Sequence, residues 1–402
     1  MNKYSYCALI FKPLGYMDLG DDFMEFGFKK EHYLLKQMLA EFTEKEVYPL
    51  AAEIDEQERF PIETVKKMKE AGIMGIPFPT KYGGEGGDYM GYVLAIEEIS
   101  KACATTGVIL SGHASLGCGP IYEYGTEEQK QKYLVPLAKG EKLGAFALTE
   151  PNAGTDSSKQ ETIALPDGDD YIMNGSKIFI TNSNYADVYI IFAMTDKSAG
   201  NRGITAFIVD YPTPGFTIGP KEKKMGIRGS STCELIFDNV RIPKENILGK
   251  LGYGFKIAMK TLDSGRIGIA AQAIGIAEGA LNETIKYVKE RKQFGRPIAA
   301  FQNTQFEIAD MATKVDAGRM LLYRAAYKKD LKEPISTAAA MAKLYCSEIA
   351  TEVTNKAVQL HGGYGYSRDY PIERMMRDAK ITEIYEGTSE VQKMVISGSL
   401  LR

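Results

Sequence analysis

The sequence predicts a mainly α-helical protein with a β-sheet domain in its middle. Three observations predict this fold class. Apolar residues recur at helical spacing up to about residue 143, gather in short β-rich runs over 144–249, and return to helical spacing over 250–402. The order of helices, strands and helices indicates three domains, at 24–143, 144–249 and 250–402, and 402 residues suffice for them.

Residues 1–23 are predicted to be an N-terminal extension, either a flexible arm or the result of a start codon placed too early. Their apolar patch at 6–11 is too short for the core of a signal peptide. They contain no arginine, which argues against a mitochondrial transit peptide. Regular patterning begins at about Met24.

Composition and charge exclude several classes of function. The net charge of −3 gives no reason to expect a nucleic-acid or membrane-surface partner, and no apolar run approaches the length of a membrane span. The five cysteines are scattered and form no CxxC pair, so we expect a reduced, cytoplasmic chain. The three histidines are scattered and are not spaced as the ligands of a metal site usually are, so we expect no metal site.

The first domain reads as helices. Leu35, Met38, Leu39 and Phe42 are spaced as one apolar stripe of a helix. A second helix is predicted between Pro61 and Gly72, and others are predicted near 93–99 and 127–134.

The middle domain changes to strand patterns. The run 171–180, with Asn174-Gly175 at its centre, predicts a hairpin, and 188–193 and 204–209 are apolar β-rich runs. Inward and outward residues alternate through 233–238. These runs predict a small antiparallel β-domain.

Long helices are predicted in the third domain near 255–292, 304–329 and 336–360, and their length indicates a helical bundle. The glycine-rich stretches at 249–254 and 361–365 lack the strand–turn–helix context of a dinucleotide fingerprint. We interpret both as helix C-cap glycines.

The segment 384–392, IYEGTSEVQ, carries the main candidate for chemistry. Ser389 to Gln392 matches a capping box, which predicts that a helix starts there. Glu386 then lies on the preceding turn, and Gly387 lets the backbone approach a ligand closely. A carboxylate buried there against an apolar ligand would have a raised pKa and could remove a proton. The alternative is an ordinary exposed loop glutamate.

Two strand ends in the middle domain combine aromatic and hydroxyl side chains. Phe146 with Thr149, and Phe179 with Thr181, offer an apolar face and small hydrogen-bonding groups, as a flavin ring requires. The alternative interpretation is core packing, with threonines present for their β-propensity.

Taken together, these segments resemble the acyl-CoA dehydrogenase family of flavoproteins over nearly all of the chain from about Met24. The motifs occur in family order: FALTEPNAGTD at 146–156, KIFITN at 177–182, Met225-Gly226, LDSGR at 262–266, RKQFG at 291–295, Gln302, QLHGGYG at 359–365 and YEGTSEVQ at 385–392.

The resemblance implies a helical N-terminal domain, a β-barrel-like middle domain and a C-terminal four-helix bundle. It implies FAD bound between the middle and C-terminal domains and a neighbouring subunit of a homotetramer, a dimer of dimers. The implied cofactor contacts are Phe146, Leu148, Thr149, Thr155, Phe179, Thr181, Arg291, Gln293, Gln302, Gln359, Gly363, Thr388 and Glu390. Many relatives have tryptophan at the position of Phe179, whereas this chain contains none.

The implied activity is the α,β-dehydrogenation of a short-chain, butyryl-CoA-like acyl-CoA to the trans-2-enoyl-CoA. By resemblance, Glu386 removes the α-proton, flavin N5 takes the β-hydride, and electrons pass to electron-transfer flavoprotein. The implied substrate contacts are Thr155, Asp263, Arg266 and Gly387. The alternative for Asp263 and Arg266 is a helix-surface ion pair, which would contribute little.

Other family members refine these expectations. Isovaleryl- and long-chain-type relatives carry the base at the position matching Gly265, so Glu386 is the carboxylate here that matches a base position. The arginine that glutaryl-CoA dehydrogenases use aligns with Gly107, which disfavours a dicarboxylate substrate. His113 either lines the acyl pocket or is a satisfied helix residue.

Three further functions stay open. The same site run in reverse would be an enoyl-CoA reductase, and the residues needed are the same. An acyl-CoA oxidase would differ in oxygen access, and its members are usually longer. A non-catalytic or nucleic-acid-binding member of the fold would be expected to show a basic face and to lack Glu386.

Overall fold

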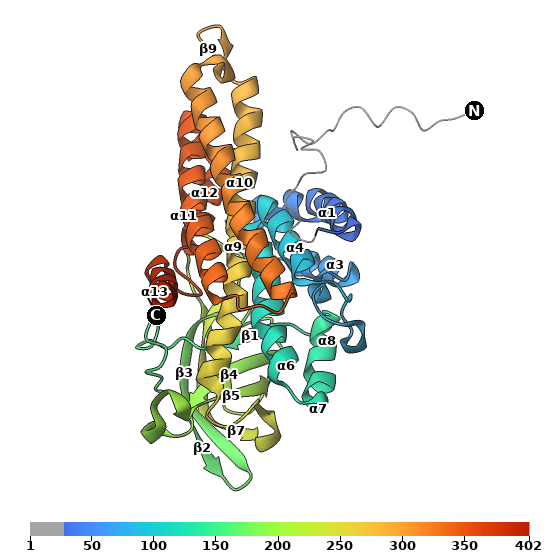
Figure 1. Cartoon of the computed structure of the whole chain (residues 1–402), viewed down its shortest axis with the longest axis vertical. Helices are drawn as coiled ribbons and strands as arrows, with labels where there is room; N and C mark the ends of the chain where they lie inside the picture. Colours follow the sequence, from blue (N-terminus) through green and yellow to red (C-terminus); the bar gives the residue numbers. More distant parts are fainter. Residues whose placement is uncertain (1–27, 402) are drawn as a thin grey trace, which may run out of the picture.

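The computed structural model describes residues 28–401, so the predicted extension at 1–23 and the predicted start of patterning at Met24 lie outside the described residues. Figure 1 shows helices of the N-terminal part beside a long helical bundle, with a sheet at the lower end of the molecule. This arrangement confirms the predicted fold class, mainly α with a β-sheet in the middle of the chain.

The N-terminal part is built from short helices around the buried helix α4. Its helices are α1 Lys30–Phe42, α2 Ala51–Glu56, α3 Ile62–Glu70, α4 Tyr89–Ala102, α5 Ala104–Ser111, α6 Gly119–Tyr124, α7 Glu127–Gln129 and α8 Val135–Ala138. The π-helical segment η5 Gly112–Cys118 joins α5 to α6. On α1, Leu39 is buried as its spacing predicts, but Met38 is 39% exposed, so the predicted stripe is narrower than expected.

The middle part is one sheet of mixed direction. Its strands are β1 Gly144–Ala147, β2 Ile163–Asp167, β3 Asp170–Thr181, β4 Val188–Met194, β5 Ile204–Asp210, β6 Phe216–Lys221, β7 Thr232–Pro243 and β8 Ile247–Leu248. Their order is β6-β7-β3-β2-β4-β5-β8, with β1 paired to β4. Because β1 and β2 both run parallel to β4, the prediction of a purely antiparallel domain is wrong.

Alternate residues of β4 pack into two different cores. Ile190 and Phe192 pack with the helices, whereas Tyr189 and Ile191 pack with the opposite side of the sheet. A strand buried on both faces has a continuous apolar sequence, which explains the uninterrupted run that predicted it.

The hairpin predicted at Asn174-Gly175 is also wrong. Strand β3 runs through both residues, and the chain reverses earlier, at Gly168-Asp169 between β2 and β3. The pairing of β3 with β7 shifts at this point, which makes a β-bulge. A Cβ atom on Gly175 would lie 2.7 Å from Thr162, so the glycine permits a close approach of the chain rather than a turn.

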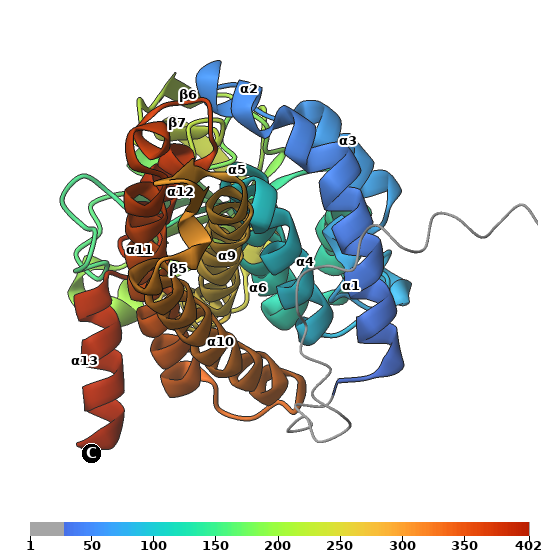
Figure 2. The ribbon, with the colours of Figure 1, turned by 90° about the horizontal axis from the view of Figure 1, so that it is seen from above.

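The C-terminal part contains the predicted long helices. Its elements are α9 Gly254–Glu290, the hairpin β9 Lys292–Gln293 and β10 Arg296–Pro297, α10 Gln302–Asp330, α11 Ser336–His361, α12 Ile372–Ile381 and α13 Ser389–Leu400. Seen from above, α9 to α12 lie together, and α13 lies on the side of the bundle opposite α1 and α3 (Figure 2).

The two glycine-rich stretches differ from each other. Gly362, with φ of +60°, is the C-cap of α11, as predicted. The stretch 249–254 follows β8 and leads into α9, so its interpretation as a helix C-cap is wrong. A Cβ atom on Gly254 would lie 2.6 Å from the backbone of Thr205, and the glycine thus lets α9 start directly against β5.

Candidate active site

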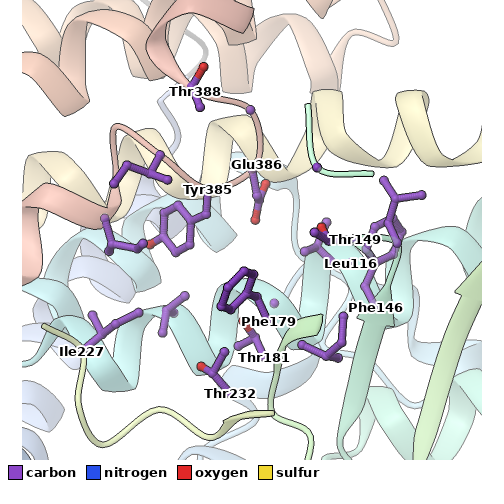
Figure 3. Close-up of a pocket in the computed structure, with 18 of the residues that line it drawn as sticks. Leu116, Phe146, Thr149, Phe179, Thr181, Ile227, Thr232, Tyr385, Glu386 and Thr388 are labelled. Carbon is purple, nitrogen blue, oxygen red and sulfur yellow. The ribbon is translucent and has the colours of Figure 1, made fainter. Parts of the chain in front are cut away.

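A cavity of about 660 Å³ lies between the sheet, α9 and the turn that joins α12 to α13. Its volume is typical of pockets that hold cofactors and small substrates. Most residues predicted for the site line it: Phe146, Leu148, Thr149, Thr155, Phe179, Thr181, Arg266, Glu386, Gly387 and Thr388. Strand ends and the C-terminal turn, far apart in the sequence, thus form opposite walls of one cavity (Figure 3).

Phe179 presents its ring to this cavity from a break in β3. The pairing with β7 shifts between Lys177 and Ile180, and Phe179 has a φ of +58°. Bulky residues rarely adopt this left-handed conformation, which costs roughly 1–3 kcal/mol. The Phe179 side chain is 61% exposed (Figure 3). A strained backbone that exposes an apolar ring inside a cavity is typical of a ligand-binding surface.

A buried ion pair, which the sequence analysis did not single out, holds the loop after β1. The Nζ atom of Lys177 donates to Glu150 Oε1 over 2.6 Å, to Gln160 Oε1 over 3.1 Å and to the carbonyl of Leu148 over 3.2 Å. The side chains of Lys177 and Glu150 are 0% and 2% exposed. The pair therefore fixes Leu148, and with it Thr149, at the cavity wall.

The helix α13 begins where the sequence predicts, but with a different cap. Thr388 is its N-cap, and Thr388 Oγ1 accepts the N–H of Val391 over 3.4 Å. The capping box predicted for Ser389 to Gln392 is therefore wrong by one residue. The side chain of Gln392 instead donates to the carbonyl of Gly387 over 2.7 Å and stabilises the turn before the helix.

Two consecutive residues of that turn have a left-handed backbone. Glu386 has a φ of +52° and Gly387 a φ of +97°. A Cβ atom on Gly387 would lie 2.7 Å from Nε2 of Gln392, so the turn requires glycine for both conformation and space. The strained conformation of Glu386 directs its side chain from the turn into the cavity (Figure 3).

The carboxylate of Glu386 is held in an environment that disfavours its charge. Its Oε2 atom is buried and has no hydrogen-bond partner among residues 28–401. Burial raises the pKa of Glu386 to about 7, although the nearby cations Lys343 and Arg266 lower it. Glu386 is therefore not the exposed loop glutamate of the alternative interpretation, and it is poised to exchange a proton near neutral pH.

The lack of a side chain at Gly265 makes room for this carboxylate. A Cβ atom on Gly265, in α9, would lie 2.0 Å from Glu386 Oε2, which no real contact permits. A side chain at position 265 would therefore occupy the space that the Glu386 carboxylate fills. This observation gives a physical reason why a chain with glutamate at 386 has glycine at 265.

Asp263 and Arg266 form a buried pair rather than the helix-surface pair of the alternative interpretation. Arg266 Nη1 donates to Asp263 Oδ1 over 2.8 Å, and both side chains are 6% exposed. Ser336 Oγ also donates to this carboxylate, over 3.0 Å. Arg266 lines the cavity with its Nε unpaired within the described chain, whereas Asp263 lies behind it and fixes its orientation.

Six predicted cofactor contacts do not line the cavity, and five of them lie elsewhere on the bundle. All five are exposed: Arg291, Gln293 and Gln302 lie in or beside the β9–β10 hairpin, and Gln359 and Gly363 lie at the end of α11 next to Tyr364, whose ring centre is 5.4 Å from the Arg291 guanidinium. Their role on a neighbouring subunit stays a prediction. Glu390, in the first turn of α13, is also exposed and is not among the cavity-lining residues.

His113 is a satisfied core residue and does not line the cavity. It is fully buried; its Nδ1 accepts the N–H of Gly144 over 3.1 Å, and its Nε2 donates to the carbonyl of Leu137 over 3.1 Å. Burial lowers the pKa of His113 to about 4, so the ring is neutral at neutral pH. The second of the two interpretations of His113 is correct.

The raised pKa of Glu386 predicts a pH-dependent stability difference. The unfolded carboxyl ionises near its ordinary pKa of 4.5, whereas the folded one holds its proton to about 7. Stability contributed by this group therefore falls as pH rises between these values. We expect Glu386→Gln to match the wild type in unfolding free energy at about pH 4.5 and to exceed it by up to about 3 kcal/mol above about pH 7.

Denaturant unfolding of both proteins, without added ligand, across this pH range measures the effect. A stability difference that does not change with pH would show that the Glu386 carboxyl ionises normally in the folded chain.

Comparisons with known proteins agree with the geometry. Three domain models of the acyl-CoA dehydrogenase family match the chain: the N-terminal domain at residues 29–141, the middle domain at 145–240 and the C-terminal domain at 252–401. The short-chain specific acyl-CoA dehydrogenase of Clostridium acetobutylicum is 62% identical over 379 residues, covering 94% of this chain and 100% of that protein. The human mitochondrial short-chain specific acyl-CoA dehydrogenase is 49% identical, covering 97% and 95%.

Solved structures show the same fold. Butyryl-CoA dehydrogenase from Megasphaera elsdenii has a TM-score of 0.93 and 53% identity, covering 94% of this chain and 100% of that chain. A chain from a study of the electron transferring flavoprotein of Acidaminococcus fermentans has a TM-score of 0.93 and 57% identity, with the same coverage. No helix in residues 28–401 is both long and apolar enough to cross a membrane.

Proposed function

The chain belongs to the acyl-CoA dehydrogenase family of flavoprotein oxidoreductases, and we propose that it catalyses the FAD-dependent conversion of a short-chain acyl-CoA to the trans-2-enoyl-CoA. The observation that carries this proposal is the Glu386 carboxylate, whose Oε2 atom is buried without a partner among the described residues and which faces a cavity large enough for a ring system and an acyl thioester.

The cavity fits a flavin ring. The exposed ring of Phe179 offers an apolar face, and Thr149 and Thr181 offer hydroxyl groups on the same wall. Phe146 and Leu148 add apolar surface at the strand that precedes Thr149. When bound, the flavin would supply a two-electron acceptor for the β-hydrogen of the substrate. We further propose that the exposed residues at the end of the bundle hold the rest of FAD from a neighbouring subunit of a homotetramer.

Glu386 would act as the base. At a pKa of about 7, a substantial fraction of its carboxyl groups are ionised at neutral pH, and the carboxylate gains stability when it takes up the α-proton. In this proposal the backbone N–H of Glu386 donates to the thioester carbonyl, which makes the α-proton more acidic. The left-handed turn at Glu386 and Gly387 would orient both the carboxylate and the backbone N–H of Glu386 toward the substrate.

The rest of the site favours a short, uncharged acyl group. Arg266, held by Asp263, presents a fixed cation at the cavity for the CoA part of the substrate. Gly107, which the resemblance aligns with the arginine of glutaryl-CoA dehydrogenases, is buried, and a Cβ atom there would lie 2.0 Å from Ser100 Oγ. Short-chain specific enzymes among the relatives support the same substrate class. We propose electron-transfer flavoprotein as the electron acceptor.

A panel of acyl-CoAs tests this proposal. The purified, FAD-loaded protein should bleach most rapidly with butyryl-CoA, more slowly with longer chains, and scarcely with glutaryl-CoA, because Gly107 occupies the position that the resemblance aligns with the arginine of glutaryl-CoA dehydrogenases. Rates with butyryl-CoA plus oxidised electron-transfer flavoprotein, compared with those for crotonyl-CoA plus the reduced form, determine the favoured direction. Protein that binds FAD but is bleached by none of these thioesters would contradict the proposal.

A further inference from the structure

A fully buried lysine lies behind the turn that carries Glu386. Lys343 belongs to α11, is 0% exposed, and donates from Nζ to the carbonyl of Gly387 over 2.7 Å. The same carbonyl accepts the side-chain N–H of Gln392 over 2.7 Å. Two donors, one from α11 and one from α13, therefore hold the carbonyl of the residue that directly follows the candidate base.

The two donors differ in charge, although they share one acceptor. Gln392 is a neutral amide, is 0% exposed, and also donates to the carbonyl of Glu386 over 3.4 Å. Lys343 brings an ammonium group into the protein interior, and burying such a charge is costly unless an opposite charge compensates it. A neutral donor can also satisfy the Gly387 carbonyl, as Gln392 does, so the hydrogen bond alone does not explain why a charged group is buried here.

The compensating charge is that of Glu386. Among the described residues no ion pair within 4.0 Å joins Lys343 to Glu386, yet Lys343 is the strongest nearby charge favouring the ionised carboxylate, ahead of Arg266. Burial lowers the pKa of Lys343 to about 8, so it is still mainly charged at neutral pH. The other titratable groups that interact with Glu386 or Lys343 are Tyr89 and Tyr92 on α4, Tyr385 on the turn itself, and the more distant Glu383 and Glu390.

We infer that Lys343 is a positioning residue of the reaction: it fixes the Glu386–Gly387 turn through the Gly387 carbonyl and holds the Glu386 carboxylate in its ionised, proton-accepting form. This inference rests on the proposed role of Glu386 as the base. Lys343 touches neither substrate nor cofactor in this account; it acts through the turn and through its charge.

Four variants separate the hydrogen bond from the charge. Lys343→Met removes both, Lys343→Gln keeps a neutral donor, and Lys343→Arg keeps the charge. Gln392→Leu is the matched control, because it removes the other hydrogen bond to the Gly387 carbonyl without removing a charge. Each is made in the FAD-loaded protein, and circular dichroism with flavin absorbance verifies folding and cofactor content.

Two readouts are measured against pH: kcat/KM with butyryl-CoA, and protonation of Glu386 by infrared difference spectroscopy. The Glu386 signal is identified by its loss in Glu386→Gln. We expect Lys343→Met and Lys343→Gln to shift the acidic midpoint of both readouts upward by about one pH unit, which lowers kcat/KM about tenfold at pH values below it. Lys343→Arg should have the same acidic midpoint as the wild type. Gln392→Leu should have a lower kcat than the wild type but an unchanged acidic midpoint.

The outcomes distinguish this inference from the proposed function. If Glu386→Gln is inactive but Lys343→Gln and Lys343→Met keep the wild-type midpoint in both readouts, the inference about Lys343 is wrong and the base assignment stands. If Glu386→Gln keeps wild-type activity, the proposed function itself fails. If Gln392→Leu shifts the midpoint as far as Lys343→Gln does, the hydrogen bond, not the charge, controls the carboxylate, and the inference is overturned.

Discussion

Replacing Glu386 with glutamine should reduce the rate of flavin bleaching by butyryl-CoA by about 100- to 10,000-fold, the usual contribution of a positioned general base. Glutamine has nearly the same shape as glutamate and fits the same pocket, but it cannot accept the α-proton. Binding of the thioester should change little, because the pocket keeps its volume. Stopped-flow absorbance gives the bleaching rate, and a non-reducing thioester analogue gives the binding constant.

The matched control is Glu352→Gln, which removes an exposed carboxylate from the surface of α11. Glu352 pairs with Lys314 at the surface, and such pairs contribute little, so this variant should bleach at the wild-type rate. If Glu386→Gln bleached as rapidly as this control, another group would have to remove the proton.

Adding a single methyl group at Gly265 should have a comparably large effect. The Cβ atom of alanine would lie 2.0 Å from Glu386 Oε2, so either the carboxylate or α9 must move. Because α9 is buried along most of its length, we expect the carboxylate to move and the helix to stay in place. A displacement of about 1 Å at a reacting group can cost about 100-fold in rate. Gly265→Ala should therefore lose about 100-fold in kcat for butyryl-CoA while it retains FAD.

Gly398→Ala is the control for the change of glycine to alanine within a helix. Gly398 lies in α13, and a Cβ atom there would contact nothing within 4 Å. Alanine is about 1 kcal/mol more favourable than glycine in a helix, so this variant should be as active as the wild type and no less stable. Wild-type kcat in Gly265→Ala would show that the carboxylate does not need the space that glycine leaves.

Local sequence patterns predicted most of the helices and the two apolar strands. The spacing of apolar residues along the sequence matches the face of each helix or strand that packs into the core. The long runs near 255–292 and 336–360 became α9 and α11, and the apolar run at 188–193 became β4. The same local reasoning failed at Asn174-Gly175. This dipeptide is typical of a turn, but here the close approach of Thr162 requires the glycine, and that contact is invisible to a local pattern.

The sequence predicted the residues of the site that belong to local motifs, but not the residues that support them from elsewhere in the fold. Motif order identified Glu386, Phe179 and Thr181, and the structure brings all three to one cavity. The supporting roles of Lys343 and Lys177 were missed, because these roles come from burial and long-range contacts. One sequence signal was available: Lys343 lies four residues after Ala339 and three before Cys346, on a face of α11 that is otherwise uncharged and buried. A lysine in such a stripe needs a partner elsewhere in the fold.

The proposed role of Glu386 depends on where its carboxylate lies when a substrate is present. An experimental structure with FAD and a non-reducible butyryl-CoA analogue measures this directly. We predict that the carboxylate lies against the carbon next to the thioester carbonyl, with the flavin ring on the opposite face beside Thr149, Phe179 and Thr181. A carboxylate turned into bulk water, or an analogue bound in another part of the molecule, would contradict the proposed role of Glu386.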